Sequence, residues 1–229
     1  MSFALREGKS ATSGAPWRVT VVSMLSAVAS QGWLKLGPLM FPCALGRSGC
    51  RARKREGDGA TPSGLWRVHG VLYRRDRVGR PRTRLPVRAM RPCDGWCDAP
   101  ADRNYNRPVR HPYPAGAERL WRADELYDVV VVLDYNERPR VRWRGSAIFM
   151  HVAKRGYAPT EGCIALARPH LLRVLERLGP LSSVAVAAPQ KKRPKLSLRA
   201  SRARTGEVAC SDKRRGPMER GPRRKRSPQ

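Results

Sequence analysis

The segment that decides our interpretation of the chain is GSAIFMHVAKRGYAPTEGCIALARPHLLRVLERL, Gly145–Leu178. An apolar run, Ser146–Met150, ends on His151, and a polar loop containing glycine and proline separates it from Cys163. A helical pattern begins near Pro169. This order predicts a strand that presents a histidine, then a loop, then a cysteine at the start of the next element.

The residue types in this segment are those of nucleophilic catalysis. A thiol reacts as its thiolate, and a neighbouring imidazole is the usual base that produces one near neutral pH. Gly162 before Cys163 lets backbone N–H groups converge beside the sulfur, as an oxyanion hole requires. A lone cysteine or histidine is more often structural, so the hypothesis depends on the combination: Cys163 as nucleophile, His151 as base, and Thr160, Glu161 and Gly162 as support around the oxyanion.

The composition is compatible with one folded domain between two polar ends. The chain has 229 residues, of which 41% are hydrophobic, enough for a single core. We predict a disordered N-terminal segment over 1–16, a folded domain over 17–188 and a basic disordered tail over 189–229. Lys and Arg number 47 against 18 Asp and Glu, a net charge of +29. Residues 190–229 hold 15 of these cations and 3 of the acids, so 12 of the 29 charges lie there. Such a balance favours polyanionic neighbours.

Most of the predicted elements are strands. Asp128–Leu133, DVVVVL, is a continuous apolar run, which is typical of a strand buried on both faces. Together with Ser146–His151 we expect it to form the centre of the sheet and to place His151 at the sheet's rim. The remaining predicted strands are Arg18–Ser23, Trp33–Met40, Leu65–Tyr73 and Ser183–Ala188.

Two helices are predicted. The first is a short helix over Glu118–Leu126. The second begins near Pro169, which suits a first helical turn, and ends before Gly179-Pro180. Its expected apolar stripe is Leu171, Leu172, Leu175 and Leu178. The fold class is therefore mainly β with one or two helices (α+β).

The cysteines and histidines outside the segment do not form a metal-binding pattern, so we predict no metal and no cofactor. Cys93 and Cys97 are separated by three residues, and they would either form a disulfide or flank a turn at Asp94-Gly95-Trp96. We favour the turn. His111, between Arg110 and Pro112, is interpreted as an exposed loop histidine.

No run of about 20 apolar residues is present, so we predict no transmembrane helix. Val19–Ala29 is apolar and ends on Ala27-Val28-Ala29, which is similar to a signal-peptide cleavage site. The same segment also suits the first strand of the domain. We favour the strand, which leaves no convincing export signal in the sequence.

At these residues the chain resembles the L,D-transpeptidases of the YkuD type. Their catalytic signature is a strand ending in His, a variable loop, and Ser/Thr-x-Gly-Cys-Ile/Val, matched here by His151 and Thr160–Ile164. The resemblance extends over Trp17–Ala188. Three further stretches support it: Pro42–Gly49, Lys54–Gly64 and Tyr105–Val109.

This resemblance implies both a fold and an activity. The fold would be the mixed-sheet β-sandwich of that catalytic domain. The activity would be transfer of an acyl group between peptidoglycan stem peptides through a thioester on Cys163, with His151 moving the proton and a backbone carbonyl near the cysteine orienting the ring. It further implies a location in the cell envelope or periplasm. We expect a monomer with no specific nucleic acid partner.

The sequence departs from the family pattern at two positions. Many members carry His or Arg where this chain has Glu161, and Arg where it has Ala165. A carboxylate beside the thiol would raise the pKa of the thiol unless a nearby cation compensates. The candidate cations are Lys154, Arg155 and Arg168.

Three other functions remain as alternatives. An L,D-carboxypeptidase-like hydrolase would use the same pair of residues, with water in place of the acceptor amine. A non-catalytic polyanion-binding protein would explain the charge of the chain. A sortase-like enzyme would require an arginine on a later strand, and Ser183–Ala188 contains none.

Overall fold

The computed structural model describes residues 18–23 and 29–187 and shows a mainly β fold with one α-helix. All described residues lie in one unit of the chain. The predicted ends, 1–16 and 189–229, fall outside the described residues. The strands are β1 (Arg18–Ser23), β2 (Gln31–Leu36), β3 (Leu39–Ala44), β4 (Cys50–Arg51), β5 (Thr61–Pro62), β6 (Gly64–Tyr73), β7 (Val87–Ala89), β8 (Asp94–Cys97), β9 (Pro108–Arg110), β10 (Ala117–Arg119), β11 (Val129–Leu133), β12 (Phe149–Val152), β13 (Ile164–Leu166) and β14 (Ser183–Val186). The helices are the 3₁₀ turn η1 (Arg155–Tyr157) and α1 (Arg168–Leu175).

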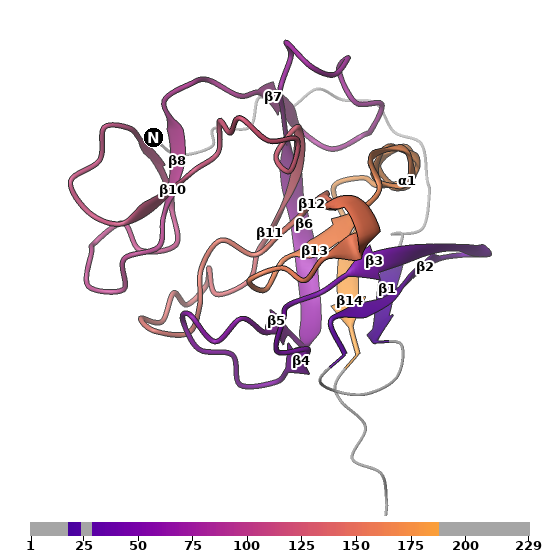
Figure 1. The fold of residues 1–229 in the computed structure, drawn as a ribbon, viewed down its shortest axis with the longest axis horizontal. Coiled ribbons are helices and arrows are strands. Elements are labelled where there is room, and N and C mark those ends of the chain that lie inside the picture. The colour runs from indigo at the N-terminus through magenta and orange to yellow at the C-terminus, as the bar shows by residue number, and fades with distance from the viewer. Residues whose placement is uncertain (1–17, 24–28, 188–229) are drawn as a thin grey trace, which may run out of the picture. The chain divides into compact units, whose positions relative to one another are not determined.

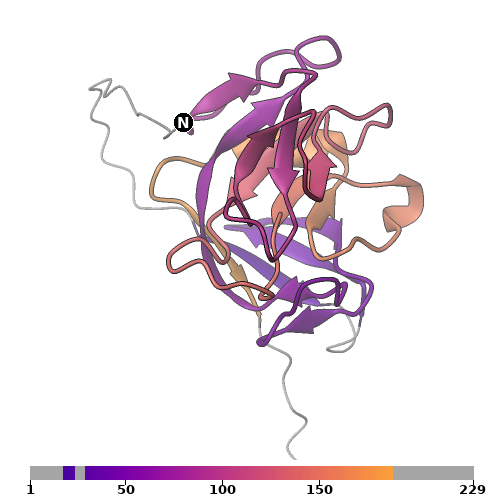
Figure 2. The ribbon, with the colours of Figure 1, turned by 90° about the vertical axis from the view of Figure 1, so that its left-hand side faces the viewer.

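One mixed sheet curls until its ends meet. Its strand order is β11-β12-β13-β3-β2-β1-β14-β6-β7, and β6 additionally pairs with β11. The first part of β6, Gly64–Arg67, pairs with β14, and the part from Val68 to Tyr73 pairs with β11. Figure 1 shows β6 as the longest arrow, and Figure 2 shows it as a curved strand. The mainly β class is thus confirmed, but the sandwich is not, because one long twisted strand joins both ends of a single barrel-like sheet.

The two faces of the sheet are buried under different elements. Val129, Val131 and Leu133 of β11 belong to the larger core, on which α1 packs. Val130 and Val132 face a second, smaller core. As expected for an unbroken apolar strand, every residue of β11 is buried.

A small three-stranded sheet, in the order β10-β8-β9, packs on the second core through Trp96 of β8. Trp96 of this sheet meets the ring of Phe149 on β12 edge to face, with the ring centroids 5.1 Å apart. The predicted turn at Asp94-Gly95-Trp96 is wrong, because burial of Trp96 against Phe149 favours a strand there. The predicted helix over Glu118–Leu126 is also wrong, since Glu118 and Arg119 end β10 and the residues after them form bends and a turn. Cys93 and Cys97 are both free thiols, so no disulfide joins them.

Several predicted boundaries also change. The segment Trp33–Met40 spans a hairpin rather than one strand, since Gly37, at φ 59°, turns the chain between β2 and β3. β1 confirms the strand over Arg18–Ser23, and β14 confirms the closing strand. No helix within 18–23 and 29–187 is long and apolar enough to cross a membrane.

The helix α1 ends one turn earlier than predicted. Its last helical residue is Leu175, and Glu176 caps it. Leu171, Val174 and Leu175 are its buried residues, whereas Leu172 is only partly buried. The predicted stripe was thus wrong at one position, because Val174 takes the inward place that we assigned to Leu172.

Candidate active site

The parallel pairing of β12 and β13 positions the two proposed catalytic side chains. His151 on β12 lies opposite Ala165 on β13, and Cys163 directly precedes β13. Successive side chains of a strand point to opposite faces, so His151 and Cys163 project from the same face of neighbouring strands. We expected His151 to lie at the rim of the sheet, and this expectation is wrong. It is 5% exposed and sits between β11 and β13.

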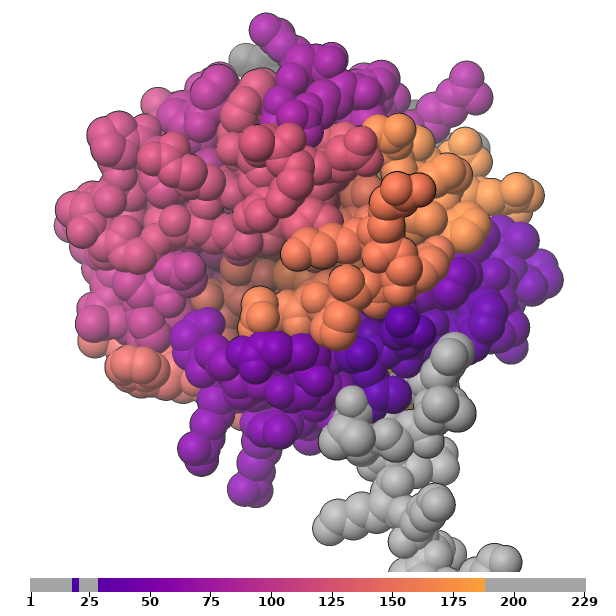
Figure 3. All heavy atoms as spheres, viewed as in Figure 1, coloured from indigo at the N-terminus to yellow at the C-terminus, as the bar shows by residue number. Residues whose placement is uncertain are grey.

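Both side chains line one cavity of about 510 Å³. Its walls come from four parts of the chain, which are residues 54–57, Asp98, residues 118–127 and residues 146–165. The space-filling view is hollowed where these segments meet (Figure 3). A thiol and an imidazole that open into one hollow can act on one ligand.

The sulfur and the imidazole each have a backbone partner. The thiol of Cys163 donates to the carbonyl oxygen of Ala147 at 3.2 Å and accepts a hydrogen bond from the N–H of Phe149 at 3.4 Å. Nδ1 of His151 lies 2.8 Å from the carbonyl oxygen of Val152. That carbonyl assigns the proton of the neutral ring to Nδ1 and leaves Nε2 as the basic nitrogen. The orienting carbonyl is thus beside the histidine and not, as we expected, near the cysteine.

Burial keeps both groups uncharged. Desolvation raises the pKa of Cys163 to about 12, with a further increase from the Glu118 carboxylate, while the Phe149 N–H and Lys54 oppose it. Desolvation lowers the pKa of His151 to about 4, against the stabilising contact with the carbonyl of Val152. At neutral pH the site therefore holds a thiol and a neutral imidazole, not an ion pair.

Thr160 and Gly162 shape the turn that carries the cysteine. The hydroxyl of Thr160 donates to the carbonyl oxygen of Cys163 at 2.6 Å and accepts from the N–H of Gly162 at 3.2 Å. Gly162 has φ +138°, and a Cβ there would lie 2.8 Å from the carbonyl oxygen of Ala60. The turn therefore requires glycine. The N–H of Gly162, which we assigned to the oxyanion, is occupied by Thr160 in this structure.

The predicted effect of Glu161 on the thiol is wrong. Its carboxylate pairs with Arg47 at 2.9 Å, and both side chains are largely solvent-exposed. The acid that raises the pKa of Cys163 is Glu118, and the cation that lowers it is Lys54. The three compensating cations that we named were Lys154, Arg155 and Arg168, and none of them affects the thiol in this way.

Two residues beside the pair were missed: Glu118, in the segment that we predicted to be a helix, and Tyr127, directly after that segment. The hydroxyl of Tyr127 donates to Glu118 at 2.6 Å, and the Tyr127 ring meets the His151 ring at a steep angle with the centroids 5.2 Å apart. Burial raises the pKa of Glu118 as well. No local pattern in the sequence indicates that these residues face His151.

Asn106 fixes the backbone of Ala147, whose carbonyl accepts the hydrogen bond from the Cys163 thiol. Its Oδ1 accepts from the N–H of Ala147 at 3.1 Å and from the indole of Trp96 at 2.9 Å. Its Nδ2 donates to the carbonyls of Tyr135 and Asn136. The Tyr105–Val109 stretch that supported the resemblance thus contains a residue that positions the Ala147 carbonyl.

The remaining histidines and acids do not form a metal centre. Over the part of the chain that the structure covers, no cluster of three or more His, Cys, Asp or Glu side chains is arranged to hold an ion. His111, which we expected to be exposed, is half-buried, and its Nε2 is buried without a hydrogen-bond partner.

The fold and the site define a mainly β protein with a cysteine and a histidine in one cavity. The family model of the L,D-transpeptidase catalytic domain, YkuD, matches residues 33–186. The chain belongs to this family, which confirms the resemblance.

Among solved structures, the chain is similar to the crystal structure of Mycobacterium tuberculosis L,D-transpeptidase 1 at 1.89 Å, with 12% sequence identity and a TM-score of 0.30. The alignment covers 74% of this chain and 62% of that chain. This chain therefore matches less than two thirds of the length of that protein. No curated protein matches the chain.

Proposed function

We propose that this protein is a peptidoglycan L,D-transpeptidase, which transfers an acyl group between stem peptides through a thioester. The observation that carries the proposal is the placement of His151 and Cys163 on one face of adjacent parallel strands, in a single cavity. Family membership supplies the substrate class. Because that substrate lies in the cell envelope, we propose that the protein acts there, as a monomer.

In the first step Cys163 becomes acylated. The Sγ–H proton leaves the carbonyl of Ala147 for Nε2 of His151, and the sulfur attacks the carbonyl carbon of a stem peptide. The C–N bond then breaks, and the departing amine takes the proton from the imidazolium. The product is a thioester on Cys163 with a neutral histidine beside it.

In the second step an amine of another stem peptide attacks the thioester. His151 takes the proton of this amine and returns it to the sulfur as the C–S bond breaks. Water in place of the amine gives hydrolysis, which is the carboxypeptidase-like alternative.

Negative charge develops on the substrate oxygen in both steps. We propose the backbone N–H groups of Cys163 and Gly162 as its donors, where one such donor contributes about 10²–10³ in rate in other enzymes. The N–H of Gly162 can donate to the substrate oxygen only after its hydrogen bond to the hydroxyl of Thr160, 3.2 Å long in this structure, is broken. Occupation of the site by the substrate therefore includes a small rearrangement of the 160–163 turn.

The test is incubation with disaccharide-tetrapeptide muropeptides, followed by mass spectrometry. We expect cross-linked dimers, a thioester on Cys163 and no product from Cys163→Ala. Cys93→Ala is the matched control, because Cys93 is a free thiol that does not line the cavity. Absence of both dimer and thioester across a range of pH, with Cys163 still free, contradicts the proposal. Shortened peptides without dimers indicate the hydrolase instead.

A further inference from the structure

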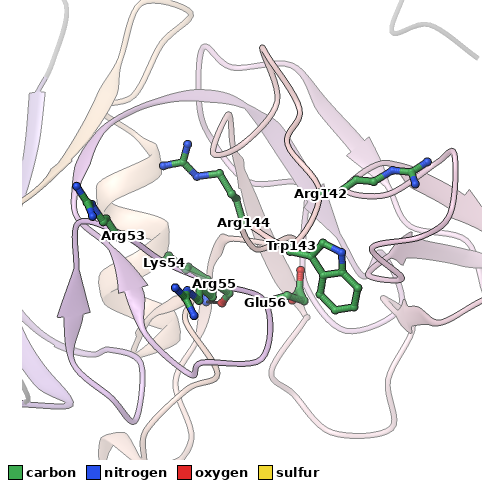
Figure 4. A pocket seen from close by; sticks show the side chains of 7 residues that line it. All are labelled: Arg53, Lys54, Arg55, Glu56, Arg142, Trp143 and Arg144. Atoms are coloured by element: carbon green, nitrogen blue, oxygen red, sulfur yellow. Dashed lines mark hydrogen bonds between the residues drawn. The ribbon is translucent and has the colours of Figure 1, made fainter.

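A second cavity, of about 520 Å³, lies beside the first. We call it the basic pocket. Its lining comes from two loops, one with Arg53, Lys54, Arg55 and Glu56 and one with Arg142, Trp143 and Arg144 (Figure 4). The N–H of Glu56 donates to the carbonyl of Trp143 at 2.9 Å, so the two loops are joined.

The arginines of the basic pocket are exposed and have no acidic partner. Within 18–23 and 29–187, no carboxylate lies in salt-bridge distance of any of the four, which are Arg53, Arg55, Arg142 and Arg144. Lys54, by contrast, is buried and paired with Asp58 at 2.8 Å. Exposed guanidinium groups without a salt bridge, on the lining of one cavity, are suited to a carboxylate or a phosphate, which a guanidinium binds through paired N–H groups.

The basic pocket shares part of its wall with the cavity of Cys163. Lys54 and Glu56 line both cavities. The hydroxyl of Ser146 donates to Glu56 at 2.9 Å, and the next residue, Ala147, receives the thiol of Cys163. The wall of the basic pocket is thus linked to Cys163 through Glu56, Ser146 and Ala147.

The lining also limits the kind of anion. Glu56 lies in the wall, accepting hydrogen bonds from Tyr105 and Ser146, and a carboxylate in that place repels a chain of phosphates but attracts an ammonium group. Trp143, 65% exposed, offers an apolar ring to an aliphatic segment. A ligand with a carboxylate, an aliphatic stem and an amine matches all three features.

We propose that the basic pocket binds the carboxylate of the acyl acceptor, an amino acid or peptide that also bears the attacking amine. This inference rests on the proposed function. With its carboxylate on the arginines, the acceptor extends its amine past Glu56 toward the thioester on Cys163. The arginines are thus specificity-determining residues that act on the acceptor and not on the donor.

The kinetic test uses the double variant Arg55→Gln/Arg144→Gln, one arginine from each loop. Two acceptors are compared, a diamino acid with a free carboxylate and its carboxamide. We expect the acceptor KM of the free carboxylate to rise about tenfold, the equivalent of about 1.4 kcal/mol. Acylation of Cys163, kcat and the KM of the carboxamide stay as in the wild type. Arg75→Gln/Arg80→Gln, which removes two exposed charges on the β6–β7 loop, is the matched control. Equal KM values in both double variants overturn the proposal.

A binding test separates this inference from the proposed function. Titration calorimetry of Cys163→Ala protein measures acceptor binding without turnover, and Arg53→Gln/Arg144→Gln in the same background supplies a second arginine variant. Carboxylate-dependent binding that the arginine variant loses supports the pocket, even where the active protein forms no thioester. Transfer by the active protein, with acceptor binding unchanged in the arginine variant, overturns the pocket alone. A loss of affinity for a short oligonucleotide in the arginine variant that exceeds its loss of affinity for the acceptor overturns the carboxylate assignment.

Discussion

At the scale of single residues, burial determines how the cysteine and the histidine begin the reaction. A thiol whose pKa is raised to about 12 is almost wholly protonated at neutral pH, and an imidazole whose pKa is lowered to about 4 is almost wholly neutral. In the free protein Cys163 is therefore a protonated thiol, and His151 in the same cavity is a neutral imidazole. In the proposed mechanism, proton transfer to His151 must accompany attack on the substrate, since no preformed thiolate exists.

This state predicts an unusual pH profile. The base is inactive when protonated, so kcat/KM for acylation should fall only as the pH drops through about 4, the pKa of His151. It should stay level from about pH 6 to pH 9. Alkylation of Cys163, measured by peptide mass mapping, should rise about tenfold for each pH unit in the same range, because the thiolate fraction is small and grows with pH. An acid limb near pH 6.5 would contradict the buried, neutral histidine.

The turn before the nucleophile provides a second prediction. Gly162→Ala puts a methyl group 2.8 Å from the carbonyl of Ala60 at a φ of +138°, so it should lower the free energy of unfolding by about 1–3 kcal/mol. Acylation should slow as well, since Cys163 is the next residue. Gly156→Ala is the matched control, because Gly156 also has a positive φ, +71°, but nothing lies within 4 Å of its added Cβ. Urea unfolding of both variants is the measurement. Equal losses of unfolding free energy in the two variants would contradict the steric explanation.

At the scale of secondary-structure elements, the pairing of β12 with β13 makes the site. The loop between these strands returns the chain in the same direction, and the parallel register then brings residues 12 apart in sequence to one face. The small sheet β10-β8-β9 covers that face with Trp96, Leu120 and neighbouring residues. The elements that carry the nucleophile and the base are therefore buried on both sides, which holds their geometry while limiting access to the cavity.

Helix α1 supports the opposite face of the same strands, and this predicts a contrast between neighbouring leucines. Leu171 is fully buried, so Leu171→Ala should cost about 2–5 kcal/mol of unfolding free energy. Leu172, next along the chain, is only partly buried, so Leu172→Ala should lower the free energy of unfolding by about 1 kcal/mol or less. Urea unfolding compares the two directly. A loss at Leu172 as large as the loss at Leu171 would mean that the helix packs with the stripe that the sequence alone predicted, which contains both leucines.

At the scale of the whole molecule, the charge is divided between the family-matched domain and the C-terminal segment. Residues 190–229 hold 12 of the 29 net positive charges. Electrostatic binding to a polyanion weakens with salt in proportion to the cations engaged. Non-specific polyanion affinity and acyl transfer therefore belong to different parts of the chain in our proposal.

Deletion of residues 190–229 tests this division. We expect affinity for heparin and its dependence on salt to fall strongly, while the thermal midpoint and the acylation of Cys163 remain unchanged. The reason is that the cavity is lined by residues 54–165, none of which the deletion removes. A second deletion of equal length is not possible without cutting the sheet, so the control is the full chain at high salt. Unchanged heparin affinity would place the polyanion-binding charge in the domain itself.

The sequence by itself determined the parts of the site that lie close together along the chain. His151 near a strand end, Thr160 and Gly162 in the turn, and Cys163 after it form a local pattern, and so do the apolar runs of β11 and α1. Strand β13, which follows Cys163, was not predicted. Such patterns are readable because alternation, glycine and proline act over a few residues.

Only the tertiary structure decided which distant groups surround that pattern. Closure of the sheet by β6, strand β8 at the predicted turn, and the approach of Glu118 and Lys54 to the thiol all depend on contacts between segments far apart in sequence. The same contacts decided the protonation of Cys163 and His151, because a pKa responds to burial and to neighbouring charge. Burial is a property of the folded chain, so no local pattern contains it.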